Sequence, residues 1–189
     1  MRRVTTDIDG VVIFEPRAFT DDRGTFMETY HHGRYADNGV GVEFCQDNVS
    51  ISRQGTLRGL HYQHPRGQGK LVQVLQGEVV DVAVDIRRGS PTFGRSVTAV
   101  LSEANHRQMF IPEGFAHGFC VTSKSALFVY KCSQFYAPDC EGGVLWCDPD
   151  LAITWPVNAP LLSPKDQRFP RLADIPTERL PVYLKPSQK

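Results

Sequence analysis

The sequence predicts a mainly β fold, an antiparallel sandwich or barrel of the jelly-roll kind with a few short helices. Short runs of β-branched and aromatic residues recur along the chain, and segments rich in Gly, Pro, Asn and Asp separate them. No 3.6-residue periodicity lasts longer than a few turns, which argues against long helices. Closure into a sandwich or barrel is expected because an open sheet leaves unpaired backbone groups along its edges.

The expected strands have the alternation, or the β-branched and aromatic content, that fits a pleated and half-buried surface. The first strand ends before Pro16, because proline has no backbone donor for a sheet ladder. A turn at residues 76–78 separates two successive β-rich runs. The expected strands are residues 10–15, 25–30, 44–50, 57–63, 71–75, 79–86, 96–101, 108–111, 116–121 and 126–132.

Residues 1–189 are expected to form one domain, with the core in about residues 8–175, because this length is a normal domain size. Helices are expected to be few, with one around residues 161–174. Residues 176–189 contain little core material, so we expect an interaction tail or a partly disordered segment there.

The charge pattern argues against two classes of partner. The chain has 21 Lys and Arg against 21 Asp and Glu, without a long basic run, which disfavours a nucleic-acid surface and a polybasic membrane patch. No run approaches the roughly 18 apolar residues that span a bilayer, and the N-terminus lacks the apolar segment of an export signal. We therefore expect a soluble, unexported protein that meets any anionic ligand with a local cluster.

Cysteine usage favours a reducing compartment. The five cysteines form no Cys-x-x-Cys pair, so the sequence suggests neither a disulfide framework nor a zinc knuckle. A cytoplasmic location fits best, with the cysteines serving as small buried hydrophobes or loop thiols.

Arg58, His61 and Lys70 stand in a stretch that is otherwise built to be buried, a mixture that a fold rarely needs for packing alone. Because β-rich runs follow directly, a site here would be held on rigid strands. Arg58 and His61 are three residues apart and would face opposite sides of a regular strand. We expect a bulge at Gly59 to turn both toward one ligand. Gln46 and Asn48, two residues apart, share a face without any bulge.

Two patterns resemble the cupin superfamily: a glycine at position 77, seven residues after position 70, and the spacing of residues 112–117. Cupins place a metal-binding glutamate before that glycine, where this chain has Lys70. A fixed cation repels a divalent metal, so no metal is expected. The histidines that this prediction excludes as metal ligands are His61, His64 and His117.

A fuller set of motifs resembles the dTDP-4-dehydrorhamnose 3,5-epimerases, which are dTDP-deoxysugar epimerases of the cupin superfamily. The resemblance runs in order through about residues 8–175, and such a set is more specific than any one motif. The matching segments are residues 22–24, 26–28, 46–48, 57–61, 68–70, 81–85, 89–94, 112–119, 130–132, 136–138 and 163–166.

The resemblance implies a dTDP-linked 4-keto-6-deoxyhexose as substrate, whose keto group acidifies the hydrogens at carbons 3 and 5. Epimerisation needs a base, stabilisation of the enolate oxygen and an acid on the other face, and no cofactor. By resemblance, His61 is the base, since a free imidazole has a pKa of ~6.5, and Asp166 orients it. Tyr130 is then the proton donor, and Lys70 opposes the charge on the carbonyl oxygen.

The same resemblance implies how the ligand and the partner subunit are held. Arg23, Arg58 and Lys165 would meet the diphosphate, because guanidinium forks and ammonium groups suit phosphate oxygens. A homodimer is implied in which the N-terminal strand reaches across, so that some of its residues serve the partner's site. The remaining nucleotide or sugar contacts carried over are Phe26, Glu28, Gln46, Asn48, His117 and Glu141.

The preferred interpretation is a 3,5-epimerase of dTDP-L-rhamnose biosynthesis, which would supply rhamnose for a cell-surface polysaccharide. The nearest alternative is an enzyme that epimerises only carbon 3, or only carbon 5, of a related nucleotide-linked 4-ketosugar. A metal-dependent cupin dioxygenase is disfavoured by Lys70. A non-catalytic sugar-nucleotide binding protein is disfavoured by the joint presence of His61, Tyr130 and Asp166.

Overall fold

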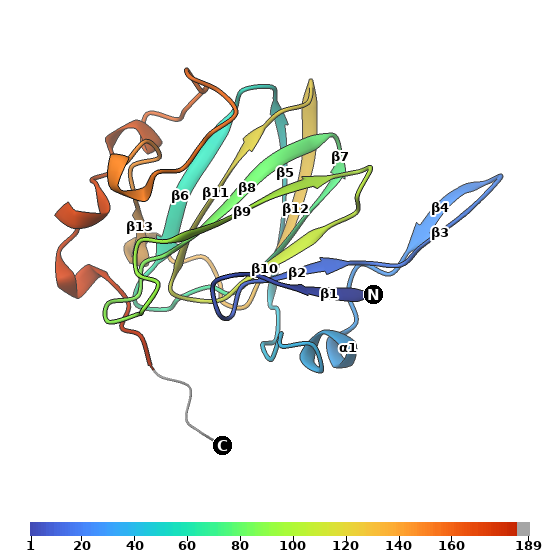
Figure 1. Ribbon diagram of the computed structural model, residues 1–189, viewed down its shortest axis with the longest axis horizontal. Coiled ribbons are helices and arrows are strands. Elements are labelled where there is room, and N and C mark those ends of the chain that lie inside the picture. The colour runs from blue at the N-terminus through green and yellow to red at the C-terminus, as the bar shows by residue number, and fades with distance from the viewer. Residues whose placement is uncertain (185–189) are drawn as a thin grey trace.

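The structure, a computed structural model that describes residues 1–184, has two antiparallel sheets that face each other (Figure 1). The first sheet has six strands in the order β1 (Arg2–Thr5), β2 (Val12–Glu15), β10 (Gln108–Ile111), β7 (Lys70–Gln76), β12 (Ser125–Cys132) and β5 (Gln46–Arg53). The second has five in the order β13 (Glu141–Gly143), β6 (Leu57–Gln63), β11 (Phe115–Val121), β8 (Glu78–Asp85) and β9 (Ser96–Ser102). The prediction of a mainly β jelly roll is confirmed.

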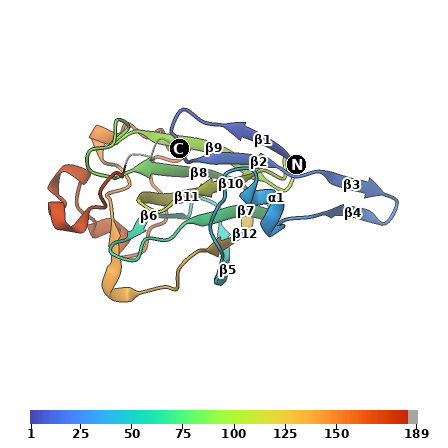
Figure 2. The same cartoon turned by 90° about the horizontal axis from the view of Figure 1, so that it is seen from below.

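A separate two-stranded hairpin, β3 (Ala18–Asp21) and β4 (Gly24–Met27), projects from the body of the molecule. Figures 1 and 2, which view the chain from directions at right angles, both show it extending beyond the sheets. Its turn spans Asp21 to Gly24, and Gly24 has a φ of +124° that suits glycine. We call β3 and β4 the arm.

The helices are short. The chain has one α-helix, α1 (His32–Ala36), and five 3₁₀ turns, η1 (Pro138–Cys140), η2 (Pro149–Leu151), η3 (Asp166–Arg168), η4 (Leu172–Asp174) and η5 (Thr177–Arg179), within residues 1–184. In that part of the chain no helix is long and apolar enough to cross a membrane.

The helix predicted around 161–174 is present only as two short 3₁₀ helices, η3 and η4, and not as one continuous helix. Pro164 and Pro170 interrupt it, and each lacks the backbone donor that a continuous helix needs. The helix α1 was not predicted, because five residues are too few to show a helical period.

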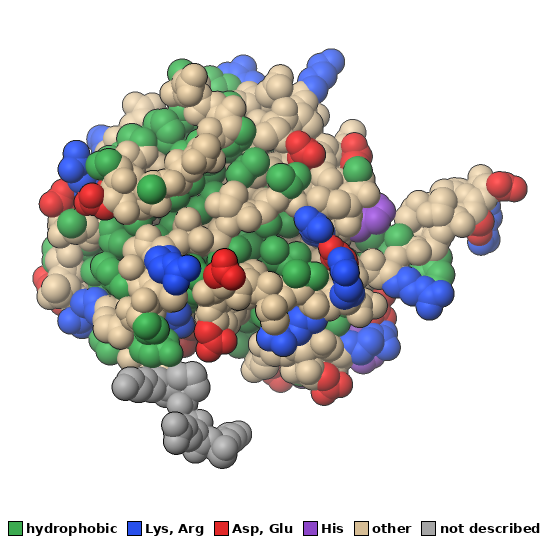
Figure 3. All heavy atoms as spheres, in the orientation of Figure 1, with side chains coloured by type: hydrophobic (Ala, Val, Ile, Leu, Met, Phe, Trp, Pro, Cys, Tyr) green, Lys and Arg blue, Asp and Glu red, His purple; other side chains and the backbone are tan. Residues whose placement is uncertain are grey.

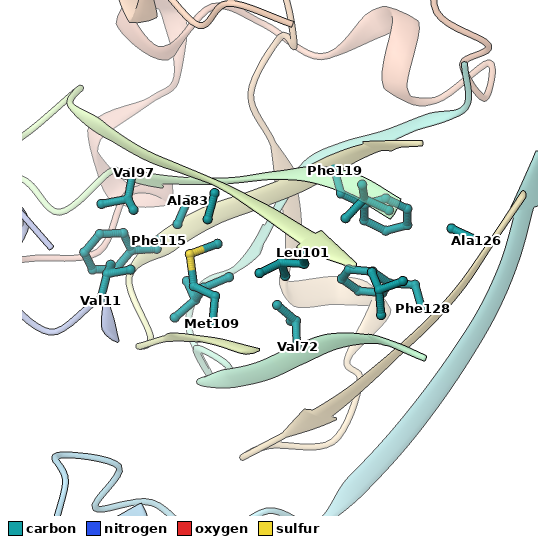
Figure 4. Packing of buried hydrophobic residues seen from close by; sticks show 14 of the residues in the cluster. Val11, Val72, Ala83, Val97, Leu101, Met109, Phe115, Phe119, Ala126 and Phe128 are labelled. Atoms are coloured by element: carbon teal, nitrogen blue, oxygen red, sulfur yellow. The ribbon is translucent and has the colours of Figure 1, made fainter. Parts of the chain in front are cut away.

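The main core fills the space between the two sheets. Figure 4 shows Val72 and Phe128 from the six-stranded sheet packed toward Leu101 and Phe119 from the other. The rings of Phe119 and Phe128 stack with their centroids 4.1 Å apart. Burial of each such side chain contributes roughly 1.5–3 kcal/mol, so this cluster fixes the distance between the sheets.

Two further clusters cover the outer faces of the sheets. Tyr35 of α1 packs on Phe14 and Phe110 over part of the six-stranded sheet. On the other side, the C-terminal segment, orange to red in Figure 1, lies along the five-stranded sheet, and its Leu180 is buried against that sheet. The little core material expected after residue 175 therefore includes one true core residue.

The expected C-terminal tail is attached to the body as far as it is described. Arg179 donates a hydrogen bond to the backbone oxygen of Glu141, and Val182 forms a bridge with Arg88. Residues 185–189, also part of that expectation, lie outside the described residues.

The bulge expected at Gly59 is present. On β11, His117 pairs with His61 and Phe119 pairs with Arg58, so two steps on β11 oppose three on β6. Gly59 has a φ of +131°, and a Cβ there would lie 2.5 Å from the Cα of Gly118. Because His117 and Phe119 share one face of β11, their partners Arg58 and His61 both face the space between the sheets.

This close approach predicts that Gly59→Ala destabilises the fold more than Gly55→Ala does. Both glycines have positive φ, but a Cβ at Gly55 meets nothing within 4 Å. Gly55→Ala should therefore lower the free energy of unfolding by about 1–2 kcal/mol, the cost of a left-handed backbone. Gly59→Ala should cost ~1–3 kcal/mol more from steric overlap. Urea denaturation measures both, and equal losses would contradict the close packing of β6 on β11.

Candidate active site

The predicted catalytic side chains meet at a cavity of about 230 Å³ at one end of the space between the sheets. β6 supplies His61, β7 supplies Lys70 and β12 supplies Tyr130. Lys70 and Tyr130 lie in the inward-facing series of their strands, next to Val72 and Phe128, and the bulge at Gly59 turns His61 inward. The complete lining is Gln46, Asn48, His61, Tyr62, Gln63, Gln68, Lys70, Tyr130, Cys132, Tyr136 and Glu141.

His61 is paired with Asp166, which lies 105 positions later in the chain. The Nε2 atom of His61 is 2.7 Å from Oδ1 of Asp166, and the Asp166 side chain is almost fully buried. An anionic Asp166 accepts the hydrogen bond from Nε2, which leaves Nδ1 of His61 as the nitrogen with a lone pair. Within residues 1–184 this second nitrogen has no hydrogen-bond partner.

The chain brings Asp166 to His61 through the segment that follows Trp155. Leu161 forms a parallel bridge with Thr56 and accepts a hydrogen bond from the Leu57 backbone, at the start of β6. Burial alone would raise the pKa of Asp166, but hydrogen bonds from His61 and Ser163 outweigh it, so the pKa is lowered. The carboxylate is thus anionic at neutral pH.

Tyr130 and Lys70 respond oppositely to the same burial. Burial raises the pKa of the Tyr130 phenol, with a smaller opposing effect from Arg58, so the phenol keeps its proton at neutral pH. Burial lowers the pKa of the Lys70 ammonium, and the negative charges of Asp81 and Glu141 oppose that shift. The Lys70 side chain has no hydrogen-bond partner among the described residues.

Polar groups from three segments surround the mouth of the cavity. Tyr136 donates a 2.7 Å hydrogen bond to Oε2 of Glu141, which also forms an ion pair with Lys165. Gln46 donates to Oδ1 of Asn48 over 3.1 Å and accepts from the Tyr136 backbone. The shared face predicted for Gln46 and Asn48 is therefore confirmed, and Glu141 and Lys165 lie at the same mouth.

Arg58 and His117 lie beside the cavity rather than in its lining. Nε of Arg58 donates to Oγ of Ser52 over 3.1 Å on the inward face of β5. Nε2 of His117 lies 3.0 Å from both carboxylate oxygens of Asp81. His117 is also the cross-strand partner of His61, so the two imidazoles occupy neighbouring positions on adjacent strands.

The structure does not bring Arg23, Phe26 and Glu28 to this cavity. Arg23 lies near the tip of the arm, paired with Asp21, and Phe26 is 72% exposed. Glu28 follows the arm and forms an ion pair with Arg34. Figure 3 shows charged side chains of both signs at the end of the arm, away from the body.

Sequence reasoning missed several residues of the site. Gln63 and Cys132 stand two positions after His61 and Tyr130, so the strand period could have placed them in the cavity. Tyr136 lies in a loop, where no period applies. The residues missed are Tyr62, Gln63, Gln68, Asp81, Cys132 and Tyr136.

No group of three or more His, Cys, Asp or Glu side chains is arranged to hold a metal ion within residues 1–184. The absence of a metal stays a prediction from Lys70.

This geometry defines a class of protein: a jelly-roll enzyme of the cupin type whose enclosed His, Tyr and Lys side chains can move protons. Comparison with known proteins gives the family. The sequence model for dTDP-4-dehydrorhamnose 3,5-epimerase matches residues 5–174. The chain therefore belongs to the dTDP-4-dehydrorhamnose 3,5-epimerase family, whose members are isomerases.

Individual relatives agree over nearly the full length. A dTDP-4-dehydrorhamnose 3,5-epimerase from Shigella flexneri is 54% identical over 177 residues, which cover 92% of this chain and 97% of the relative. One from Methanothermobacter thermautotrophicus is 46% identical over 186 residues, covering 97% and 98%. A crystal structure of dTDP-6-deoxy-D-glucose-3,5-epimerase from Legionella pneumophila, in complex with dTDP-4-keto-L-rhamnose, has a TM-score of 0.95, 50% identity and coverage of 97% and 98%.

The position of Lys70 predicts that purified protein carries no stoichiometric metal. A metal would have to displace the charge of this ammonium, which supplies no lone pair. We expect well under one zinc, iron or manganese ion per chain by elemental analysis, and the same thermal midpoint with and without EDTA. One equivalent of any of these metals, lost together with stability in EDTA, would contradict the prediction.

Proposed function

We propose that this protein converts dTDP-4-dehydro-6-deoxy-D-glucose to dTDP-4-dehydro-L-rhamnose, by epimerisation at carbons 3 and 5, in dTDP-L-rhamnose biosynthesis. The observation that carries the proposal is one cavity lined by His61, Lys70 and Tyr130, with Asp166 bonded behind the histidine. The names of the relatives, at 46–54% identity over most of the chain, support the same reaction.

The first step is proton abstraction next to the keto group. Nδ1 of His61 takes a proton from carbon 3 or carbon 5, and the electron pair of that C–H bond moves to the oxygen at carbon 4 as an enolate. Asp166 fixes the ring orientation and stabilises the imidazolium that forms. The Lys70 ammonium stabilises the enolate oxygen, where an enclosed charge has large leverage.

The second step inverts the carbon. Tyr130 comes from β12, in the sheet opposite to β6 and His61, so it can deliver its proton to the other face of the sugar. The phenolate then regains a proton from solvent, and His61 loses its own. Every proton removed is replaced, and no electrons leave the substrate, so the reaction needs no redox cofactor.

Binding of the nucleotide would use the groups around the mouth. Arg58 and Lys165 carry the positive charge that suits a diphosphate. The polar groups that we assign to the sugar or the base are Gln46, Asn48, His117 and Glu141. Arg23, Phe26 and Glu28 join them only from a second subunit, because they lie on the arm or directly after it, away from the cavity of their own chain.

We infer a homodimer from two features: the projecting arm and an exposed apolar surface on the six-stranded sheet. The arm projects without packing on its own body (Figures 1 and 2). On the outer face of the six-stranded sheet, Val49 and Ile51 of edge strand β5 are 65% and 75% exposed. A second copy could cover that face while its arm reaches the cavity. All five cysteines are free, which supports the cytoplasm as its location.

The reaction is tested by hydrogen exchange. With dTDP-4-dehydro-6-deoxy-D-glucose in heavy water, NMR should show deuterium entering at both carbon 3 and carbon 5. His61→Ala should slow both exchanges by about 10²–10⁴-fold, because proton transfer has lost its base. Tyr130→Phe should lower turnover more than affinity for dTDP, which calorimetry measures. Normal exchange in His61→Ala would refute the assignment of the base.

A single-carbon epimerase is the second candidate. A relative from Streptomyces niveus that is 42% identical over 186 residues is named a dTDP-4-dehydrorhamnose 3-epimerase. The exchange experiment separates the two, since label at carbon 3 alone identifies the single-carbon enzyme. Affinity for dTDP without exchange at either carbon identifies a binding protein.

The shared site is tested by mixing two inactive variants, His61→Ala and Arg23→Ala. If the arm serves the partner, a mixed dimer has one cavity with an intact His61 and an intact Arg23 from the other chain. Random reassembly should then restore about a quarter of wild-type activity, because half the dimers are mixed and half of their sites are whole. If each arm serves its own chain, mixing restores nothing.

A further inference from the structure

Asp81 is a carboxylate that packing does not explain. It lies in the middle of β8 between valines, its side chain is 0% exposed, and alternation turns it toward the space between the sheets. Both of its oxygens are 3.0 Å from Nε2 of His117, and the side chain forms no other hydrogen bond within residues 1–184. A buried carboxylate is costly unless charged or polar groups compensate it.

The groups that face Asp81 belong to the site. His117 holds it from β11 and is itself paired across the ladder with His61. Lys70 lines the same cavity as His61 from the opposite sheet, and the negative charge of Asp81 raises the pKa of its ammonium against the effect of burial. The other titratable or charged groups in or beside the cavity are Tyr130 and Cys132 of β12, Glu141 of β13, and His61 and Arg58 of β6.

We propose that Asp81 is a positioning residue for the reaction, which holds the His117 ring on the wall beside His61 and serves as the buried counter-charge of the Lys70 ammonium. This inference rests on the proposed function, in which Lys70 stabilises the enolate oxygen. Asp81 itself touches neither the substrate nor the reacting atoms, and it acts through His117 and Lys70.

The need for such a counter-charge follows from the enclosure of Lys70. Burial lowers the pKa of this ammonium, and the neighbouring negative charges oppose that shift. Glu141 is one of them, but it lies at the mouth, where it already accepts from Tyr136 and pairs with Lys165. Asp81 is fully enclosed, so solvent screens its charge less. Removing that charge should let Lys70 lose its proton at a lower pH.

The test is the pH profile of Asp81→Asn, which keeps the shape of the side chain and removes its charge. The alkaline limb of kcat for deuterium exchange should move to lower pH by about 1–2 units, the size expected for loss of one close opposite charge. Affinity for dTDP should stay within about threefold of wild type, because the amide oxygen of the asparagine can still accept from Nε2 of His117 and keep that ring in place. Asp81→Glu should return the limb toward its wild-type position.

The matched control is Asp85→Asn, at the C-terminal end of β8. Asp85 is equally buried, but it is bonded to Arg87, Ser90 and Thr92, away from the cavity. Its loss should lower the melting temperature without moving the alkaline limb. A shift of the same size in Asp85→Asn would mean that the limb reports general destabilisation, and the role of Asp81 would be overturned.

A second measurement does not need turnover. The pH dependence of Lys70 acetylation by acetic anhydride, followed by mass spectrometry, reports the neutral amine directly, and its midpoint should fall in Asp81→Asn. An unchanged midpoint and an unchanged limb in an active protein would overturn the inference. Absence of exchange in the wild-type protein would instead refute the proposed function, whatever the acetylation shows.

Discussion

The register of three neighbouring strands determines where the core ends and the site begins. β7, β12 and β5 pair so that inward-facing residues form rows across the sheet, and successive rows lie two residues apart. A slip of one residue would turn every member of these rows to the outer face. The same hydrogen bonds therefore fix both the packing and the chemistry. Across β7, β12 and β5 the rows are Val74, Phe128 and Ser50, then Val72, Tyr130 and Asn48, then Lys70, Cys132 and Gln46.

Strand β6, on the opposite sheet, follows the same two-residue alternation, with one exception at Gly59. There the extra residue in β6 restores Arg58 and His61 to one side, and only glycine fits so close to Gly118. A substitution at this position would thus alter the site without touching a ligand. Asp166 depends on yet another contact, the bridge of Leu161 beside the start of β6.

The catalytic side chains were assigned from a specific motif, and their roles stay predictions. The sequence was sufficient for most strands of the two sheets, because they follow a two-residue period, but it missed the short strands β1, β3 and β13. It was not sufficient for the region around 161–174, where Pro164 and Pro170 divide a helical composition into turns. The pairing of His61 with Asp166 came from resemblance alone, since no local pattern connects positions 105 apart. Asp81 was part of a matched segment, but its role emerges only where β8 packs against β11.

The cavity has to hold three groups in different protonation states at one pH. Enclosure favours the neutral form of every group, so it keeps the proton on Tyr130 but works against the ammonium of Lys70. It also works against the Asp166 carboxylate, where hydrogen bonds from His61 and Ser163 reverse the effect. Lys70 has no such hydrogen bonds among the described residues and depends on charges at a distance. A drier cavity would hold the proton on Tyr130 more firmly and would also remove the proton of Lys70, so a buried negative charge such as that of Asp81 is needed to keep the ammonium charged.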